Sequence, residues 1–458
     1  MGKNIFSVVL LSLLFAVSLV YDLKLAIAII LMITSVILIS RSELVFICIY
    51  FFVYFVLAGF VGRMSFSLSG AQSINLLGIL NIIMILFFYF KVKDFLQLET
   101  WYWNKHIIYP VILFSLYLLL TVPFSISLLT SIRGLTRLLS AFSFYLLAYF
   151  VVVKNSHVEK KIFKFITIVF VFLSVYGIIE YVTGYNIFYN RLISSKIYLG
   201  YEVIQTFSRI RTTFYHPSQY SFALLILLPL YLFYFVKKKE KKYFYGLIVL
   251  LFLINILLTF TRITWIALFI QLLLFLILFK PKKIMRFALP LGIAVILLSG
   301  QIIARATTVD GSALQRFEFL QFGLELFKAH PVFGCGLETF FELSTSRFGE
   351  NIAAHGDYIR MFAETGAFGG IGSLMLLSMM IIFAIKNFKE NDFAKVSFLM
   401  IMGFLIFGIT DNAWGYCHIF WGLLGIYNGV IVREKIRLKT KISRGKVDVK
   451  LKDTLLPV

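Results

Sequence analysis

Charged residues are scarce in this chain of 458 amino acids, and acidic residues are the scarcest of them. Lysine, arginine, aspartate and glutamate make up 14% of the sequence, with 22 acidic residues against 44 basic ones. Soluble globular proteins carry roughly 25% charged residues. The shortage of charge therefore excludes a soluble globule. An apolar content of 60% and a mean hydropathy of +0.92 indicate a membrane protein that crosses the bilayer many times.

Cysteines and clusters of metal-binding residues are also scarce. Cys48 and Cys417 fall inside apolar runs and Cys335 stands alone outside them, so no disulfide between cysteines of the outer face is expected. The sequence has no Asp-x-Asp-like pair and no His/Cys cluster with the spacing of a metal site. We therefore expect neither a metal nor another cofactor.

Long apolar runs are what the sequence has in abundance. Runs of roughly 17 to 22 residues recur along the chain, about the length that a helix needs to cross the hydrocarbon core. They predict an all-α polytopic membrane protein with about 12–14 transmembrane helices. The runs span residues 5–21, 23–40, 43–61, 74–90, 107–123, 135–153, 162–183, 218–236, 243–260, 263–279, 285–303, 367–385, 396–410 and 414–432. No small-residue cleavage site follows the first run, so we interpret it as a helix and not as a signal peptide.

Two connections between these runs are long enough to form a site, and function often resides in such loops. The predicted divisions are an N-terminal transmembrane bundle (1–183), a first long outer loop (184–217), further transmembrane helices (218–303), a large outer loop with the candidate catalytic residues (304–366), C-terminal transmembrane helices (367–432) and a basic cytoplasmic tail (433–458).

The large outer loop is expected to contain amphipathic helices. Its segment 311–340 predicts a helix that ends at His330-Pro331, with one apolar stripe. We expect this helix to lie along the membrane interface or to cap the bundle. The predicted stripe consists of Leu314, Phe317, Leu320, Leu324 and Phe327.

The lysines predict the orientation of the chain. Cytoplasmic loops retain Lys and Arg, and all the basic clusters fall on one side of a fourteen-helix count, so both termini are expected in the cytoplasm. This orientation and an attraction to anionic membrane lipids explain the net charge of +22 without nucleic acid as a partner. The clusters are Lys91/Lys93/Lys105, Lys154/Lys160/Lys161/Lys164, residues 237–242, residues 280–286, Lys386/Lys389/Lys395 and the tail from Arg433.

The opposite, outer face carries arginine instead. Only Lys24, Lys196 and Lys328 among its basic residues are lysines. One such arginine alone is most often a headgroup or salt-bridge residue. The bias across the whole set favours an anionic ligand, because a guanidinium binds phosphate oxygens in bidentate fashion and stays charged when partly desolvated. The arginines are Arg63, Arg133, Arg137, Arg191, Arg209, Arg211, Arg262, Arg305, Arg316, Arg347 and Arg360.

Two short segments place arginines at the outer membrane boundary. In RIRTTFYHPSQYSFALL (209–225), two arginines precede a His-Pro turn that opens the next helix; Pro217 suits a first helical turn, and His216 is interpreted as structural. In LLTFTRITWIAL (257–268), Arg262 separates two apolar runs. It either snorkels beside the interfacial Trp265 or is held at the depth of lipid phosphates as part of a site.

The segment HGDYIRMFAETG (355–366) places ionisable groups directly before an apolar run. Near-helical spacing predicts an amphipathic re-entry into the next helix, with close helix contact at Gly366, Gly369, Gly370 and Gly372. Glu364 is expected to pair with Arg360 at i,i+4, or to orient another arginine, and not to act as a second base. Asp357 is predicted to be a helix N-cap.

The order of these motifs resembles the O-antigen ligase and polymerase superfamily of bacterial cell-surface polysaccharide assembly. Arginines before T-F-x-H-P, then T-R-x-x-W, H-P-x-x-G-x-G and H-x-x-Y-I-x-x-x-x-E-x-G-x-x-G follow one another over about 205–375. The resemblance implies a metal-independent, inverting membrane glycosyltransferase of GT-C type in the bacterial cytoplasmic (inner) membrane. Its donor would be a glycan on undecaprenyl diphosphate, used at the outer face. Its acceptor would be a glycan or a lipid-linked molecule.

The resemblance also implies the roles of individual residues. His355 is the essential histidine, and Arg316 is the arginine of the large loop. Arg262 is the arginine of the turn, and Arg209 or Arg211 is the one before the His-Pro turn. With Arg360, these arginines are expected to bind the diphosphate, and Asp357 and Glu364 to support them. Gly356 follows the histidine where the family usually has an amide side chain, which counts against a ligase proper.

The chemistry fits these residue types. Arginines stabilise the charge of a diphosphate leaving group in place of a metal. A histidine with an ordinary pKa near 6.5 is suited to accept the proton of the attacking hydroxyl.

Three interpretations of function remain open. The leading one is a glycosyltransferase, and the sequence does not separate a polymerase from a ligase. The second is a transporter or flippase of a polysaccharide precursor or small anion. The predicted helices carry few charges, however, and the polar residues concentrate in outer loops. The third is a non-catalytic assembly subunit, which gives no reason for the arginine bias.

Overall fold

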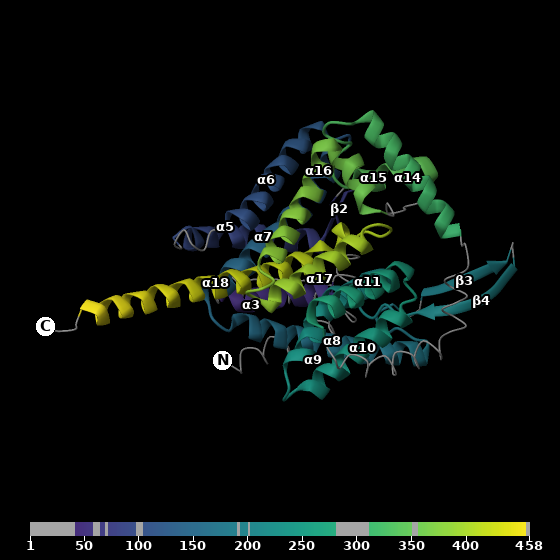
Figure 1. Ribbon diagram of the computed structural model, residues 1–458. Coiled ribbons are helices and arrows are strands. Elements are labelled where there is room, and N and C mark those ends of the chain that lie inside the picture. Colours follow the sequence, from purple (N-terminus) through teal and green to yellow (C-terminus); the bar gives the residue numbers. More distant parts are fainter. Residues whose placement is uncertain are drawn as a thin grey trace.

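The computed structural model describes residues 42–57, 65–68, 72–97, 104–189, 193–199, 202–280, 311–349 and 356–454. Helices dominate this part of the chain, and the all-α polytopic fold is confirmed (Figure 1). The strands within it form two antiparallel hairpins, β1 (Ser65–Leu68) with β2 (Gln72–Asn75) and β3 (Ile193–Leu199) with β4 (Glu202–Arg209). The predicted runs 5–21, 23–40 and 285–303 lie outside the described residues.

Each predicted run within the described residues coincides with a helix. Six helices there are long and apolar enough to cross a membrane: 105–124, 128–154, 158–183, 217–237, 262–279 and 357–386. The helices are α3 (Glu43–Phe52, continued by a π-helical turn Val53–Leu57), α5 (Leu76–Leu96), α6 (Lys105–Thr121), α7 (Leu128–Lys154), α8 (Val158–Thr183), α9 (Pro217–Lys237), α10 (Lys242–Leu258), α11 (Arg262–Phe279), α14 (Gly311–Ala329), α15 (Thr339–Phe348), α16 (Asp357–Lys386), α17 (Asp392–Phe407) and α18 (Cys417–Thr454).

Helices α7 and α18 lie side by side in the centre of the bundle (Figure 1). Trp421 of α18 meets Phe142 of α7 edge to face, with ring centroids 5.0 Å apart. A Cβ at Gly425 would overlap the Tyr145 carbonyl, so this glycine lets the two backbones approach closely. Leu113 of α6 and Phe269 of α11 are more than 60% exposed, as suits side chains that face lipid.

Ion pairs join two of the predicted basic clusters, residues 237–242 and the tail from Arg433, to acidic residues at one end of the bundle. Lys237 pairs with Asp392 at 2.9 Å, and Lys435 with Glu390 at 3.7 Å. The Arg433 guanidinium lies 2.9 Å from the Glu159 carboxylate. These contacts join the ends of α8, α9, α16, α17 and the tail of α18. We call this end the lysine end. The opposite end, where α9, α11 and α16 begin, is the arginine end.

Helices α14 and α15 cover the arginine end with a small core of their own. Phe319 and Phe322 of α14 pack with Phe340 of α15 and Ala363 of α16, and all four are buried. Phe317, Leu320 and Leu324 of the predicted stripe are 41–59% exposed, so the stripe is not the face of α14 that packs on the bundle. Apolar residues occupy two faces of this helix, and the cap buries the other one. Phe327, also part of the predicted stripe, packs on Phe362 of α16. The side chain of Leu314 is not among those that the structure describes.

Candidate functional site

Helix α16 begins ten residues before the predicted run 367–385 and is broken at Gly366, directly before that run. Gly366 adopts φ 70° and ψ −173°, which interrupts the helical hydrogen bonds. Backbone groups inside a membrane protein must find partners within the protein. The loop 330–338 and α6 supply them. Cys335 N–H donates to the Ala363 carbonyl (2.9 Å), Gly336 N–H to Glu364 (3.0 Å) and the Tyr117 hydroxyl to Thr365 (2.6 Å), while Ala367 N–H donates to Pro331 (2.8 Å).

The break explains why two of the motifs contain glycine. Gly334 has φ 76°, and a Cβ there would overlap the carbonyl of Glu364. A Cβ at Gly366 would likewise overlap the carbonyl of Val332. The two motifs H-P-x-x-G-x-G and E-x-G therefore form one structure. In it, backbone groups of the loop 330–338 form hydrogen bonds with α16 where that helix is broken. Of the predicted close contacts, Gly369 and Gly372 do face α6, at Tyr117 and Phe114.

The cysteine of this loop is a structural residue. Cys335 is fully buried, and burial raises the pKa of its thiol to about 12. The Thr339 hydroxyl, which donates to the Gly336 carbonyl at 2.6 Å, lies 3.1 Å from the Cys335 sulfur. A neutral thiol is a poor nucleophile, so no chemistry is expected from it.

Charged side chains, both buried and half-buried, surround the break. The predicted i,i+4 pair is present: Arg360 Nε lies 3.6 Å from Glu364 Oε2, and both side chains are less than 10% exposed. Arg137 of α7 pairs with Glu338 at 2.6 Å, and both interact electrostatically with Glu364. We call Arg137, Glu338, Asp357, Arg360 and Glu364 the break cluster.

Asp357 anchors the start of α16 in a way that the sequence did not predict. Gly356 is the N-cap, so the N-cap prediction for Asp357 is wrong. Its carboxylate instead accepts the backbone N–H of Trp414 at 2.9 Å, and its own N–H donates to the Gly408 carbonyl at 2.9 Å. The second carboxylate oxygen is buried and has no hydrogen-bond partner among the described residues.

His418 lies beside the break cluster, and sequence reasoning missed it. The Ser140 hydroxyl donates to the Arg137 carbonyl at 2.8 Å, so His418 Nε2, 2.7 Å from that hydroxyl, must be the donor of their contact. Nδ1 is then an unprotonated acceptor, which is buried and without a partner among the described residues. A histidine inside the apolar run 414–432 was the available signal, because ionisable residues at membrane depth are often functional.

A second group of arginines lies at the turn between α10 and α11. Arg209 donates through Nε to the Thr259 carbonyl at 2.8 Å and through Nη2 to the Thr261 hydroxyl at 3.1 Å. Arg262 is the next residue and opens α11. Two arginines predicted from separate motifs are thus brought to one turn. We call Arg209, Arg211 and Arg262 the turn group.

Arg211 is held separately from Arg209. Its guanidinium lies 3.8 Å from the centre of the Tyr189 ring, and Nη1 donates to the Tyr215 carbonyl at 3.2 Å. The buried Glu180 carboxylate accepts the N–H groups of Arg211 and Thr212 at 3.2 and 2.8 Å. These contacts fix the segment that carries both arginines.

The His-Pro turn after this segment behaves as predicted. His216 is the N-cap of α9, and its Nδ1 accepts the N–H of Ser218 at 3.3 Å. Pro217 is the first residue of the helix. The structural interpretation of His216 is confirmed.

The turn group and the break cluster share the arginine end. Ser221 of α9 bonds to Thr264 of α11 at 2.8 Å, and Phe222 packs on Phe407 of α17 with centroids 4.8 Å apart. Gly408, which ends α17, binds the N–H of Asp357. The end of α17 therefore lies between the two arginine groups.

Two predicted site residues are not placed with the others. His355 lies outside the described residues. Arg316 is on α14, and its side chain lies outside the description. Among the described residues, no group of three His, Cys, Asp or Glu side chains is arranged to hold a metal ion.

Comparison with known protein families gives a match for part of the chain. Residues 247–374 match the family model of O-antigen ligase, which confirms the resemblance for this part of the chain. The match runs from α10 to the first half of α16, so it includes Arg262, Arg316, His355 and the break at Gly366. Arg209 and Arg211 precede it. No curated protein sequence matches the chain. The protein is thus a multi-pass membrane protein in which residues 247–374 are similar to the O-antigen ligase family.

Proposed function

We propose that this protein transfers or polymerises undecaprenyl-diphosphate-linked glycan at the outer face of the bacterial cytoplasmic membrane, with both termini in the cytoplasm. The observation that carries the proposal is the convergence of Arg209 and Arg262 on one turn at the edge of the matched domain. A turn that gathers guanidinium groups at the membrane boundary suits a lipid diphosphate.

The proposed reaction is a single displacement with inversion at the anomeric carbon. The acceptor hydroxyl attacks the face opposite the diphosphate, and the bond from the sugar to the diphosphate oxygen breaks with its electron pair on that oxygen. Arg209, Arg211 and Arg262, together with Arg316, stabilise this charge in place of a metal. Arg360 contributes from the break cluster, oriented by Glu364.

The proton of the acceptor hydroxyl passes to His355 in this scheme. The chain directly after His355 is anchored, because Asp357 binds Gly408 through its N–H and Trp414 through its carboxylate. A general base acts only when it is held within hydrogen-bond reach of the proton. Asp357 therefore has a positioning role in this scheme, because it holds the chain that carries His355.

The distribution of charge favours an enzyme over a transporter. Buried charged side chains of the described residues lie at the arginine end (Glu180, Arg209, Arg211, Asp357, Arg360, Glu364) or the lysine end (Glu159, Arg433). A transporter holds its substrate near the middle of the membrane, where the described helices carry none of these charges.

Reconstitution tests the proposal. The purified protein is placed in liposomes with undecaprenyl-diphosphate glycan, and the products are separated by size and by lipid carrier. A longer glycan on the same lipid identifies a polymerase, and transfer to a second acceptor identifies a ligase. Movement of the donor across the bilayer without a new glycosidic bond would overturn the proposal in favour of a transporter.

A further inference from the structure

Helices α6 and α16 contact closely near the arginine end and separate toward the lysine end (Figure 1). Glycines allow the close contact: a Cβ at Gly369 would lie 2.9 Å from the Tyr117 ring, and one at Gly372 would lie 3.2 Å from Phe114. Further along α16, Met379 and Phe383 replace the glycines. Pro110 of α6 lies opposite and cannot donate to the His106 carbonyl, which weakens the helix there.

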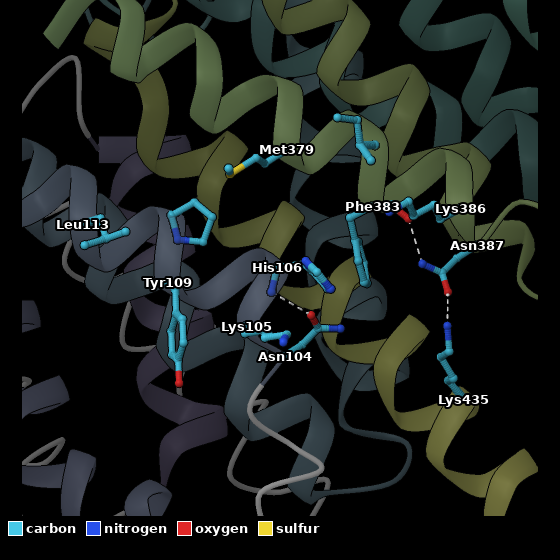
Figure 2. A pocket seen from close by; sticks show the side chains of 12 residues that line it. Asn104, Lys105, His106, Tyr109, Leu113, Met379, Phe383, Lys386, Asn387 and Lys435 are labelled. Atoms are coloured by element: carbon cyan, nitrogen blue, oxygen red, sulfur yellow. Dashed lines mark hydrogen bonds between the residues drawn. The ribbon is translucent and has the colours of Figure 1, made fainter. Parts of the chain in front are cut away.

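A pocket of about 510 Å³ opens between the two helices at this point (Figure 2). Its volume falls within the range of about 300–1,000 Å³ that small-molecule sites occupy. We call it the lysine-end groove. Its lining comes from α6, from the end of α16 and from Lys435 of α18.

The groove is apolar inside and basic at its rim. Leu113, Met379 and Ile382 form the apolar part and are 40–66% exposed, as suits side chains that face lipid. Lys105 and Lys386 stand at the rim. Lys386 lies seven positions after Met379 on α16, so the groove runs for about 10 Å along this helix.

The rim keeps an excess of positive charge. Lys435 donates to the Asn387 side chain at 3.2 Å and pairs with Glu390 at 3.7 Å. Neither Lys105 nor Lys386 has a salt-bridge partner among the described residues, and both are exposed. The first turn of α6 adds the positive end of a helix dipole. Its cap is Asn104, whose side chain accepts the N–H of His106 at 3.1 Å.

We propose that the lysine-end groove binds one anionic phospholipid of the adjacent leaflet, the cytoplasmic leaflet in the orientation given above. The phosphate lies against Lys105 and Lys386, and an acyl chain lies along Leu113 and Met379. Basic pockets between transmembrane helices at the cytoplasmic side suit anionic headgroups. The lipid fills the space where α6 and α16 separate and ties both helices to α18. This inference does not depend on the glycan chemistry.

Photolabelling of the purified full-length protein tests the proposal. A phosphatidylglycerol with a photoreactive acyl chain is added to the protein in nanodiscs, and the labelled peptides are identified by mass spectrometry. We expect labels at 105–113 and 379–386. Unlabelled phosphatidylglycerol should compete, whereas phosphatidylcholine and inorganic phosphate should not. Equal competition by phosphatidylcholine would reduce the groove to a general lipid contact, and competition by phosphate would make it a free-anion site; either result overturns the proposal.

Matched variants locate the headgroup. In the double variant Lys105→Gln/Lys386→Gln, binding should weaken by about 30-fold, because each lysine near an anionic lipid contributes roughly a fivefold factor. The control Lys238→Gln/Lys239→Gln removes two exposed charges from the same end, away from the groove, and should bind as the wild type does. Leu113→Trp fills the apolar part without changing charge and should also reduce labelling. Equal labelling in all three variants would contradict the proposal.

Discussion

The guanidinium of Arg209 shows what arginine provides at the arginine end. It donates through Nε to the Thr259 carbonyl and through Nη2 to the Thr261 hydroxyl, so the planar fork bridges two residues of one turn. A lysine ammonium is a point charge and cannot hold this fixed arrangement. At the lysine end a point charge is sufficient, as in the contact of Lys237 with Asp392.

This difference predicts the effect of Arg262→Lys. The variant keeps the charge and loses the fork, so glycan transfer should fall at least about tenfold, the loss of roughly one charge-assisted hydrogen bond. The amount of protein in the membrane should not change. Arg347→Lys is the control, because Arg347 pairs with Glu325 on the exposed surface of α14 and α15. Full activity in Arg262→Lys would leave the snorkelling interpretation.

The residue contacts that sequence could predict are the local ones. The pair of Arg360 and Glu364 follows from their i,i+4 spacing, since helix geometry alone brings such side chains together. The bond from Trp414 to Asp357 joins positions 57 residues apart, and the contact of His418 with Ser140 spans a still longer stretch. Such contacts depend on how helices pack, which no local pattern contains.

At the scale of elements, the break in α16 is the feature that organises the arginine end. The loop 330–338 supplies the hydrogen bonds that the helix loses at Gly366. The same break lies within ten residues of Asp357 and of the charged pair that follows it. Loop, helix and charges are therefore one cooperative structure.

A pair of glycine variants tests this structure. Gly334 and Gly349 both have positive φ, 76° and 71°, but a Cβ at Gly334 would overlap Glu364, whereas no atom of the described residues lies within 4 Å of one at Gly349. Gly349→Ala should cost about 1 kcal/mol for its backbone alone. Gly334→Ala should cost about 3 kcal/mol, because the loop must also leave the break. Thermal unfolding in detergent measures both, and equal effects would show that the loop is not held there.

The positions of the helices could be predicted from the lengths of the apolar runs, but the face that each helix buries could not. Apolar runs of membrane-spanning length gave the helices within the described residues, because backbone hydrogen bonding leaves a lipid-exposed chain few alternatives. The buried face of α14 could not be predicted, because Phe317 and Phe319 lie on different faces of one helix and both faces are apolar. Packing against α15 and α16 decides which face of α14 is buried, and the sequence of α14 alone does not show this packing.

At the scale of the whole molecule, basic residues divide the bundle into two chemically different ends. Lysines gather where α16 meets α17 and where α18 leaves the bundle, and the arginine groups gather at the opposite end. The charge rule predicts that the lysine end lies in the cytoplasm, as proposed above. The proposed site and the lysine-end groove then face opposite leaflets.

Cysteine labelling tests this orientation in intact cells. Ser195→Cys on β3 and Thr345→Cys on α15 should react with an impermeant thiol reagent, and Lys239→Cys and Glu390→Cys should not. The native cysteines are all buried, so the background should be low. Reaction at position 239 from outside would invert the bundle and place the arginines in the cytoplasm.

The central claim is that His355 accepts the proton while arginines replace a metal. The most direct measurement is the rate of glycan transfer from undecaprenyl diphosphate by purified protein in EDTA, for the wild type, His355→Ala and the control His330→Ala. The wild type should keep its rate, and His355→Ala should lose about 10²–10⁴-fold, the usual contribution of a general base. His330→Ala should act through folding and keep its rate per folded molecule. A His355→Ala rate close to that of the wild type, or a wild type that EDTA stops, would contradict this account.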